Sequence, residues 1–198
     1  MRGLGPSRGG VRDGRSVKEE GGMVALLSHY LLQTGFAWAV AGAMASVMLS
    51  GLGSAKGIRV AGAQAGGVLS EQPELFGKLL VLIALPGTQG FYGFICAIMI
   101  ALRCGLIGGK VETTPLVGIA IFFIGLATGV VEWKSAIFQG ETSAAAINLT
   151  AKKPDESGRA ILLPALVETY AVIALLAAIL MIIWVTAPGA VTVGAAAQ

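Results

Sequence analysis

Charged side chains are scarce in this chain of 198 residues, where Asp, Glu, Lys and Arg together make up 13%. A soluble domain carries about a quarter. Hydrophobic residues reach 55%, and the mean hydropathy is +0.79. This composition predicts an integral membrane protein without a sizeable water-soluble domain. The formal net charge of +3 is concentrated near the N-terminus and argues against nucleic acid as a partner.

Side chains that bind transition metals are also scarce. The chain has one histidine, His29, and two cysteines, Cys96 and Cys104, which lie eight residues apart in one apolar segment. No cluster of Cys and His has the spacing that zinc requires. We therefore expect both cysteines to be small packing residues and His29 to lie at a membrane boundary.

The two ends of the chain differ in composition from the middle. Residues 1–22 are rich in Gly and Arg, and Met23 opens the first apolar run. That run is longer than the about 7–15 apolar residues of a signal peptide. We expect 1–22 to be a disordered or non-native extension, with Met1 or Met23 as the start, and 187–198 to be a C-terminal tail.

Four long apolar segments predict an all-α membrane protein with four transmembrane helices. Each exceeds the roughly 20 residues that cross the hydrocarbon core of a bilayer. The segments cover about 24–66, with the helix starting near Gln33, and about 76–104, 116–149 and 159–186.

An internal repeat organises these segments into two tandem helical hairpins, 23–108 and 109–186. The polar connection around Pro73 matches the one around Pro154 at an offset of 81 positions (154 − 73). Because each repeat has an even number of spans, both share one orientation, which disfavours an inverted-repeat transporter. At this offset Glu168 corresponds to Gly87, so one hairpin alone carries a carboxylate in mid-helix.

A polar stripe interrupts the second apolar segment. Leu85, Thr88, Gln89 and Tyr92 follow the i, i+3, i+4, i+7 spacing of one helical face. Unpaired polar groups are costly in hydrocarbon. A polar stripe at this depth therefore predicts a ligand.

Polar groups on two other segments are expected at the same depth. At about 1.5 Å per residue, Glu168 lies about 15 Å from its polar loop, Gln139 about 17 Å, and Thr88 and Gln89 about 17–18 Å. If the two polar loops lie on one side of the membrane, these groups meet near its middle. An acid at this depth marks an ion or proton pathway by default.

The donor set suits a hard cation. Carboxylate, hydroxyl, amide and carbonyl oxygens are the ligands that such cations prefer, and they are supplied by Glu168, Thr88, Gln89, Gln139 and the carbonyl of Leu85. One carboxylate and one monovalent ion are together neutral. Tyr92 is placed to hydrogen-bond Glu168.

These residues carry a family resemblance. The segments Leu85–Gly93 and Val167–Ala171, together with the Lys-Lys-Pro loop at 152–154, resemble the proteolipid K subunit of bacterial and archaeal V-type ATPases. The resemblance covers roughly 33–186. It implies a multi-pass subunit of the cell membrane that forms a ring of identical copies.

The resemblance also implies a mechanism and partners. The ring, in contact with lipid and a central-stalk subunit, turns against a stator membrane subunit with an essential arginine while other subunits hydrolyse ATP. In sodium-binding members the groups matching Leu85, Thr88, Gln89, Gln139 and Glu168 hold Na+, and the tyrosine matching Tyr92 bonds the glutamate. All six positions are filled here, which favours Na+ over H+ alone.

Further charges lie within the apolar segments. Glu132 and Lys134 depart from the family pattern. Glu132 is on the face of Gln139, so we expect it either to line an outer ion route or to lie paired or near the outer interface. We also expect Glu141 to pair with Lys56 or Arg59 between inner helices, since buried ions occur as pairs.

Two rival interpretations remain. A small four-helix secondary transporter coupled to protons would explain Glu168, but it does not explain the parallel repeat or the polar layer. A purely structural four-helix membrane protein leaves the polar layer unexplained.

Overall fold

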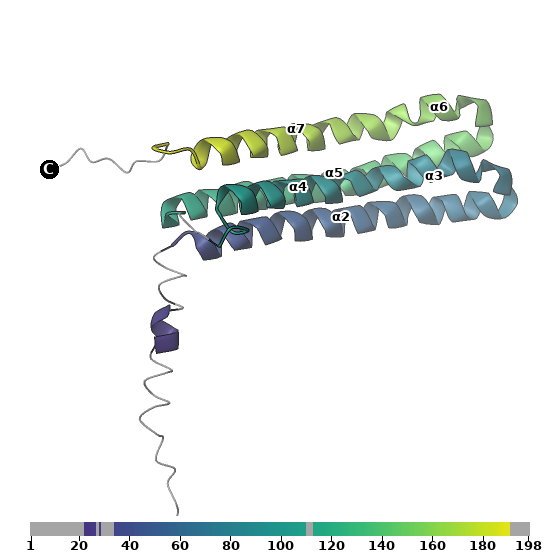
Figure 1. The fold of residues 1–198 in the computed structure, drawn as a ribbon. Helices are drawn as coiled ribbons and strands as arrows, with labels where there is room; N and C mark the ends of the chain where they lie inside the picture. The colour runs from purple at the N-terminus through teal and green to yellow at the C-terminus, as the bar shows by residue number, and fades with distance from the viewer. Residues whose placement is uncertain (1–21, 27, 29–33, 110–112, 191–198) are drawn as a thin grey trace, which may run out of the picture.

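The computed structural model describes residues 22–26, 28, 34–109 and 113–190, and within these the protein is a bundle of long helices (Figure 1). Most of the expected extension 1–22, His29 and residues 191–198 of the tail lie outside the described residues. The helices of the bundle are α2 (Phe36–Glu71), α3 (Phe76–Ala84), α4 (Thr88–Arg103), α5 (Pro115–Lys152), α6 (Ser157–Ala160) and α7 (Leu162–Val185).

Four helical spans are long and apolar enough to cross a membrane, which confirms the predicted fold class. They are Phe36–Glu71, Pro73–Arg103, Pro115–Lys152 and Pro154–Val185. The first continues beyond the expected limit at residue 66. Ala65, Val68 and Leu69 extend it because they pack in an apolar cluster with Leu79 and Ile147.

The two polar loops lie at the same end of the bundle, as the depth argument required (Figure 1). The Lys78 Nζ of one hairpin donates a hydrogen bond of 2.9 Å to the carbonyl oxygen of Pro154 in the other. The hairpins therefore lie side by side with one orientation, and residues at equal distances from the loops share a depth.

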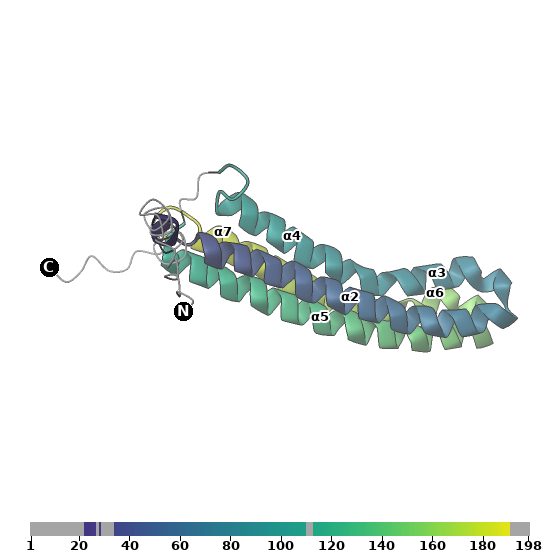
Figure 2. The ribbon, with the colours of Figure 1, turned by 90° about the horizontal axis from the view of Figure 1, so that it is seen from below.

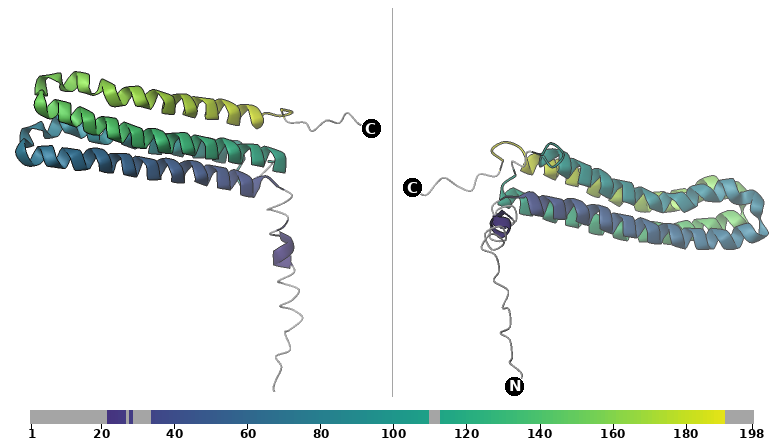
Figure 3. Two further views of the ribbon diagram at one scale, coloured as in Figure 1. Left: turned by 180° about the vertical axis from the view of Figure 1, so that it is seen from behind. Right: turned by 60° about the horizontal axis from the view of Figure 1, so that its bottom comes forward.

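The bundle has two layers. Helices α2 and α5 form one layer, while α3 and α4 of the first hairpin and α6 and α7 of the second form the other (Figures 2 and 3). The site described below lies where α4, α5 and α7 meet.

Glycines allow α2 and α5 to touch along their backbones. A Cβ atom placed on Gly140 would lie 2.5 Å from the Cα atom of Gly57, and one on Gly118 would lie 2.6 Å from that of Gly35. Such close approach by small residues is typical of membrane helices. Both pairs are 83 positions apart (140 − 57 and 118 − 35), so the two helices run parallel in constant register.

Candidate functional site

A break in the second span begins the site. Helix α3 ends at Ala84, a 3-10 turn spans Leu85–Gly87, and α4 begins at Thr88. Pro86 has no amide hydrogen and cannot continue the regular hydrogen-bond ladder. The backbone N–H of Thr88 and its Oγ1 hydroxyl both donate to the Leu85 carbonyl, the latter at 3.0 Å. The turn thus places a carbonyl and a hydroxyl oxygen together.

Both carboxylate oxygens of Glu168, on α7, have partners from the other helices. The phenol of Tyr92, on α4, donates a hydrogen bond of 2.6 Å to Oε1, as the sequence predicted. The Nε2 group of Gln139, on α5, donates to Oε2 at 3.3 Å. Glu168 is half-buried, so its carboxylate is held in one orientation at the edge of the bundle.

Two fully buried glutamines join the hairpins. Gln89 Nε2 donates to Gln139 Oε1 at 2.6 Å, and Gln139 Nε2 also donates to the Pro164 carbonyl at 3.1 Å. Thr88 Oγ1 lies 3.4 Å from Gln89 Oε1. All six residues singled out in the sequence therefore belong to one connected hydrogen-bond network.

One serine in this network and one beside it were not predicted. Ser135 accepts from Gln89 Nε2 and donates to the Val167 carbonyl, each at 3.4 Å. Ser54 accepts the backbone N–H of Gly90 at 2.8 Å. Ser135 lies four residues before Gln139, on the same helical face, and that spacing is the signal that identifies it.

The network offers one negative charge and several neutral oxygens. Gln139 turns its Nε2 toward Glu168 and its Oε1 toward Gln89. A terminal amide has an oxygen and a nitrogen end of nearly equal size. Rotation of the Gln139 amide by half a turn would thus bring its oxygen beside the carboxylate, where it and the Glu168 oxygens suit a hard monovalent cation.

Glu132 lies inside the bundle without a partner, which corrects the expectation that it is paired across helices. Its side chain is 0% exposed, and neither carboxylate oxygen has a hydrogen-bond partner among the described residues. Its face of α5 also carries Ser135 and Gln139, and that face turns toward the other helices. The outer-route hypothesis remains a prediction.

The expected pairing of Glu141 with Lys56 or Arg59 does not occur within the protomer. Among the described residues the one ion pair within 4.0 Å joins Arg159 and Glu156. All three predicted partners are exposed, because they lie on the face of the α2–α5 layer that turns away from α4 and α7. Lys134 is exposed as well, with its Nζ 5.1 Å from the ring centre of Trp133.

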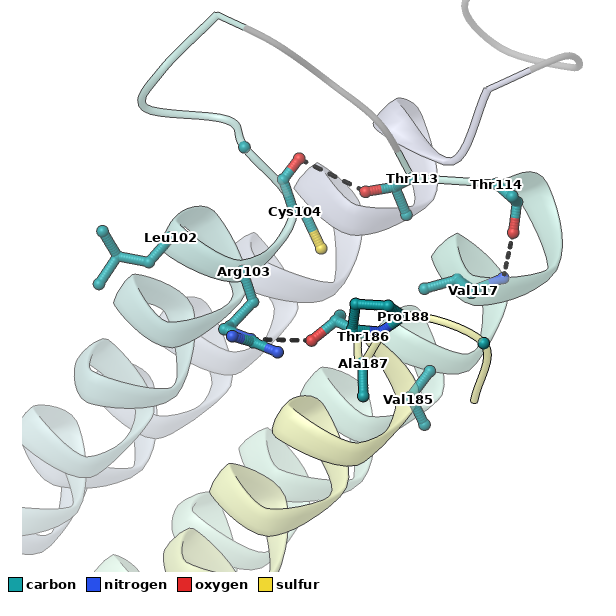
Figure 4. A pocket seen from close by; sticks show the side chains of 12 residues that line it. Leu102, Arg103, Cys104, Thr113, Thr114, Val117, Val185, Thr186, Ala187 and Pro188 are labelled. Carbon is teal, nitrogen blue, oxygen red and sulfur yellow. Dashed lines mark hydrogen bonds between the residues drawn. The ribbon is translucent and has the colours of Figure 1, made fainter. Parts of the chain in front are cut away.

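A pocket of about 460 Å³ lies at the other end of the bundle (Figure 4). Arg103 at the end of α4 reaches across it and donates to Thr186 Oγ1 at 2.9 Å, while Thr113 Oγ1 donates to the Cys104 carbonyl at 3.4 Å. None of the polar network lines this pocket. The pocket lies between the ends of α4 and α7 and is separate from the candidate site.

Comparison with known families gives a match that follows the internal repeat. The ATP synthase C-subunit family matches residues 41–100 and again residues 122–181. The two matches are shifted by 81 positions (122 − 41), the offset found in the sequence, and together they cover more than half of the chain.

Two relatives match along most of the chain. It is 36% identical over 161 residues to the V-type sodium ATPase subunit K of Enterococcus hirae, covering 80% of this chain and 99% of the relative. It is 35% identical over 167 residues to the A-type ATP synthase subunit K of Methanocaldococcus jannaschii, covering 83% of this chain and 72% of the relative.

Proposed function

The chain belongs to the ATP synthase C-subunit family, and on that premise we propose that it carries Na+ across the membrane on Glu168. It is a V-type proteolipid subunit, a multi-pass membrane component that translocates ions and does not itself hydrolyse ATP. The family implies a homo-oligomeric ring. The observation that carries the sodium proposal is the hydrogen-bond network that links one carboxylate to neutral oxygens from both hairpins.

The proposed ligands divide between the hairpins. The first hairpin supplies the Leu85 carbonyl, the Thr88 hydroxyl and the Gln89 amide, and the second supplies Gln139 and Glu168. Their hydrogen bonds place them within one network. One monovalent ion at Glu168 leaves the site neutral, which lowers the cost of crossing the lipid sector of the ring.

Tyr92 and Gln139 have positioning roles in this proposal. Tyr92 fixes the Glu168 rotamer through its 2.6 Å hydrogen bond. Gln139 is held by Gln89 on one side and the Pro164 carbonyl on the other. Rotation of its amide would exchange a donor for an acceptor beside Glu168. Such a rotation gives up the bond to the Pro164 carbonyl and requires the Gln89 amide to rotate as well, because two NH2 groups cannot pair.

The proposed transport step needs partners outside this chain. A stator membrane subunit presents an arginine that displaces the ion from Glu168 into an exit path, and a protein of the central stalk joins the ring to the subunits that hydrolyse ATP. The sodium named for the Enterococcus hirae relative supports Na+ as the cargo. A proton carried on Glu168 alone is the competing cargo.

Carbodiimide labelling of the purified ring tests the proposal. This reagent modifies carboxylic acids, and Glu168 is expected to be the one rapidly labelled acid, with the labelling slowed by added NaCl but not by choline chloride. Glu168→Gln abolishes the labelling. Glu156→Gln, a loop acid bonded to Arg159, is the matched control and leaves it unchanged.

The outcomes separate the two cargoes. Labelling of Glu168 that ignores sodium but falls with rising pH would replace Na+ by a proton. Unselective labelling of several acids would reject Glu168 as the carrier. Binding of sodium-22 to wild-type rings and its loss in Glu168→Gln provides the independent measurement.

A further inference from the structure

Bulky side chains project from the layer formed by α2 and α5, called the inner helices below, on the side away from their glycine-rich contact. On α2, Met44, Met48 and Leu52 recur every four residues and are 50%, 57% and 63% exposed. On α5, Phe123 and Phe138 are 60% and 52% exposed. Each of these two helices thus has one face of small residues turned toward the other helix and one face of large residues that are largely exposed among the described residues.

The internal repeat shows which parts of these faces meet between copies. Inside the protomer Gly57 of α2 lies against Gly140 of α5. A shift of 81 positions carries Gly57 onto Phe138 and Gly140 onto Arg59. In a ring of such repeats, α5 of one copy contacts α2 of the next copy. This contact is the repeat equivalent of the contact between α2 and α5 within one copy. Phe138 then faces Arg59 of the neighbouring copy.

We propose that Glu141 of each copy forms an ion pair with Arg59 of the neighbouring copy, and that this pair stabilises the contact between copies. Glu141 lies three residues after Phe138, so their side chains are neighbours on the helix surface. The contact between copies sets Arg59 beside Phe138, three residues before Glu141. The two charges are therefore offset by about 4.5 Å along the helix axis, which a long guanidinium side chain can span.

The sizes of the facing residues fit this pair. Phe138 and Arg59 stand where the protomer has two glycines, so the inner helices of neighbouring copies lie farther apart than α2 and α5. A long guanidinium side chain spans the wider gap. Val60, the repeat equivalent of Glu141, is half-buried within the protomer, which is the exposure expected at the edge of such a contact.

The depth of these charges gives them a reason to pair. Glu141 is two residues from Gln139, about 3 Å along the axis toward the loops. Both charges are exposed in the protomer and have no ion-pair partner among the described residues. Charged groups at this depth are costly and occur paired. A neighbouring copy supplies the partner that the protomer lacks.

Lys56 is the matched comparison. It has the same charge sign, lies on the same helix and is exposed. It precedes Arg59 by three residues, which turns its side chain by about 60° around the helix. Its repeat equivalent is Ile137, which is not among the nearest neighbours of the α2 glycines, whereas Gly140, the equivalent of Arg59, lies against Gly57. We therefore assign the pair to Arg59.

Charge exchange in the purified ring tests the pair, which rests on the ring assembly of the proposed function. Arg59→Glu and Glu141→Arg are each expected to speed thermal dissociation of the detergent-solubilised ring into monomers by about tenfold or more. The double variant is expected to recover most of the wild-type rate. Circular dichroism of the monomers checks that each variant keeps its helices.

The controls make the outcome decisive. Lys56→Glu combined with Glu141→Lys is expected to show no recovery, and an equal recovery there would overturn the assignment to Arg59. Additive effects of the two exchanges would overturn the pair itself. Where an exchanged variant fails to fold, the coupling is measured with Arg59→Gln and Glu141→Gln. A wild-type protein that is monomeric would reject the ring, whereas loss of sodium binding from intact rings would reject only the transport proposal.

Discussion

Replacing Glu132 by methionine is expected to stabilise the protein, although Glu132 is completely enclosed by the bundle. Its side chain is 0% exposed, and neither carboxylate oxygen has a hydrogen-bond partner among the described residues. The hydroxyl of Thr128, one helical turn away, already donates a hydrogen bond of 2.8 Å to the Ile124 carbonyl. The carboxyl group therefore gains nothing from its surroundings to offset its removal from water.

The size of the effect follows from two opposing contributions. A buried polar group without a partner costs about 1–3 kcal/mol. Methionine has a similar volume, and swaps of similar volume in a core cost less than about 1.5 kcal/mol. The expected net gain is about 1–2 kcal/mol, a factor of roughly 5–30 in the ratio of folded to unfolded protein.

Unfolding in mixed micelles with increasing sodium dodecyl sulfate, followed by circular dichroism, measures this gain. Glu132→Gln is the matched control, because its amide keeps the size and polarity of the side chain and so gains little. Sodium uptake by reconstituted complexes is measured in parallel. Residues that destabilise a fold are often retained because they serve its function. A Glu132→Met protein that is more stable but takes up sodium more slowly would therefore support the outer ion route.

Two results would refute the reasoning. A loss of about 1 kcal/mol or more in Glu132→Met would mean that the carboxyl has a favourable partner and is not an unsatisfied group. Greater stability of Glu132→Gln than of Glu132→Met would likewise mean that a polar group at this position has a favourable partner. An unchanged KM for sodium and an unchanged pump rate in Glu132→Gln would end the ion-route hypothesis.

Three further substitutions test the site and the packing. Tyr92→Phe removes the 2.6 Å bond to Glu168. Because a hydrogen bond to a charged group contributes about 1.5–3 kcal/mol, the sodium affinity measured by equilibrium binding is expected to fall about 10- to 100-fold. An unchanged affinity would contradict the positioning role of Tyr92. Gln139→Leu leaves Gln89 Nε2 without its 2.6 Å acceptor and is expected to abolish sodium-22 binding while the ring remains assembled; retained binding would exclude Gln139 as a ligand. In Gly57→Ala the new Cβ atom would lie 2.7 Å from that of Pro86, which is expected to cost about 1–3 kcal/mol in thermal unfolding. Gly51→Ala has nothing within 4 Å of the added atom and is the neutral control.

The polar network was predictable because hydrocarbon leaves few choices. An unpaired polar side chain is costly in these spans, which favours the meeting of the few that lie at one depth. Spacing placed Thr88 and Gln89 on one face, and distance from the loops placed Glu168 and Gln139 at their depth. The bond between Lys78 and Pro154 confirms that the loops lie together, which was the one condition left open.

The orientation of the charges on α5 was not predictable from hydropathy. Glu132 and Glu141 are nine residues apart, which is half a turn in angle, so they lie on opposite faces of one helix. The face occupied by Glu132 is buried and the other is exposed, but either choice agrees with the apolar composition. Ser135 and Ser54 were missed because serines among glycines and alanines resemble packing residues.

The proposed site has no counterpart between copies, and this asymmetry bears on how the ring works. In a ring of repeats, the contact between copies reproduces the contact between hairpins. There the positions of Glu168, Gln89, Gln139 and Tyr92 are taken by Gly87, Tyr170, Ile58 and Ile173. Without an acid or an amide this contact does not hold an ion, so on the proposed function each copy carries one ion for four spans.

That ratio favours pumping against a large potential. Moving one charge across the membrane costs about 2.3 kcal/mol per 100 mV. A ring with one acid for every hairpin moves twice as many charges per turn as a ring of the same number of hairpins built from this chain. If the number of ATP molecules per turn is the same, the energy of each ATP is divided among half as many ions. On the proposed function, glycine in place of an acid at position 87 therefore gives fewer ions per turn and a steeper gradient that the motor can sustain.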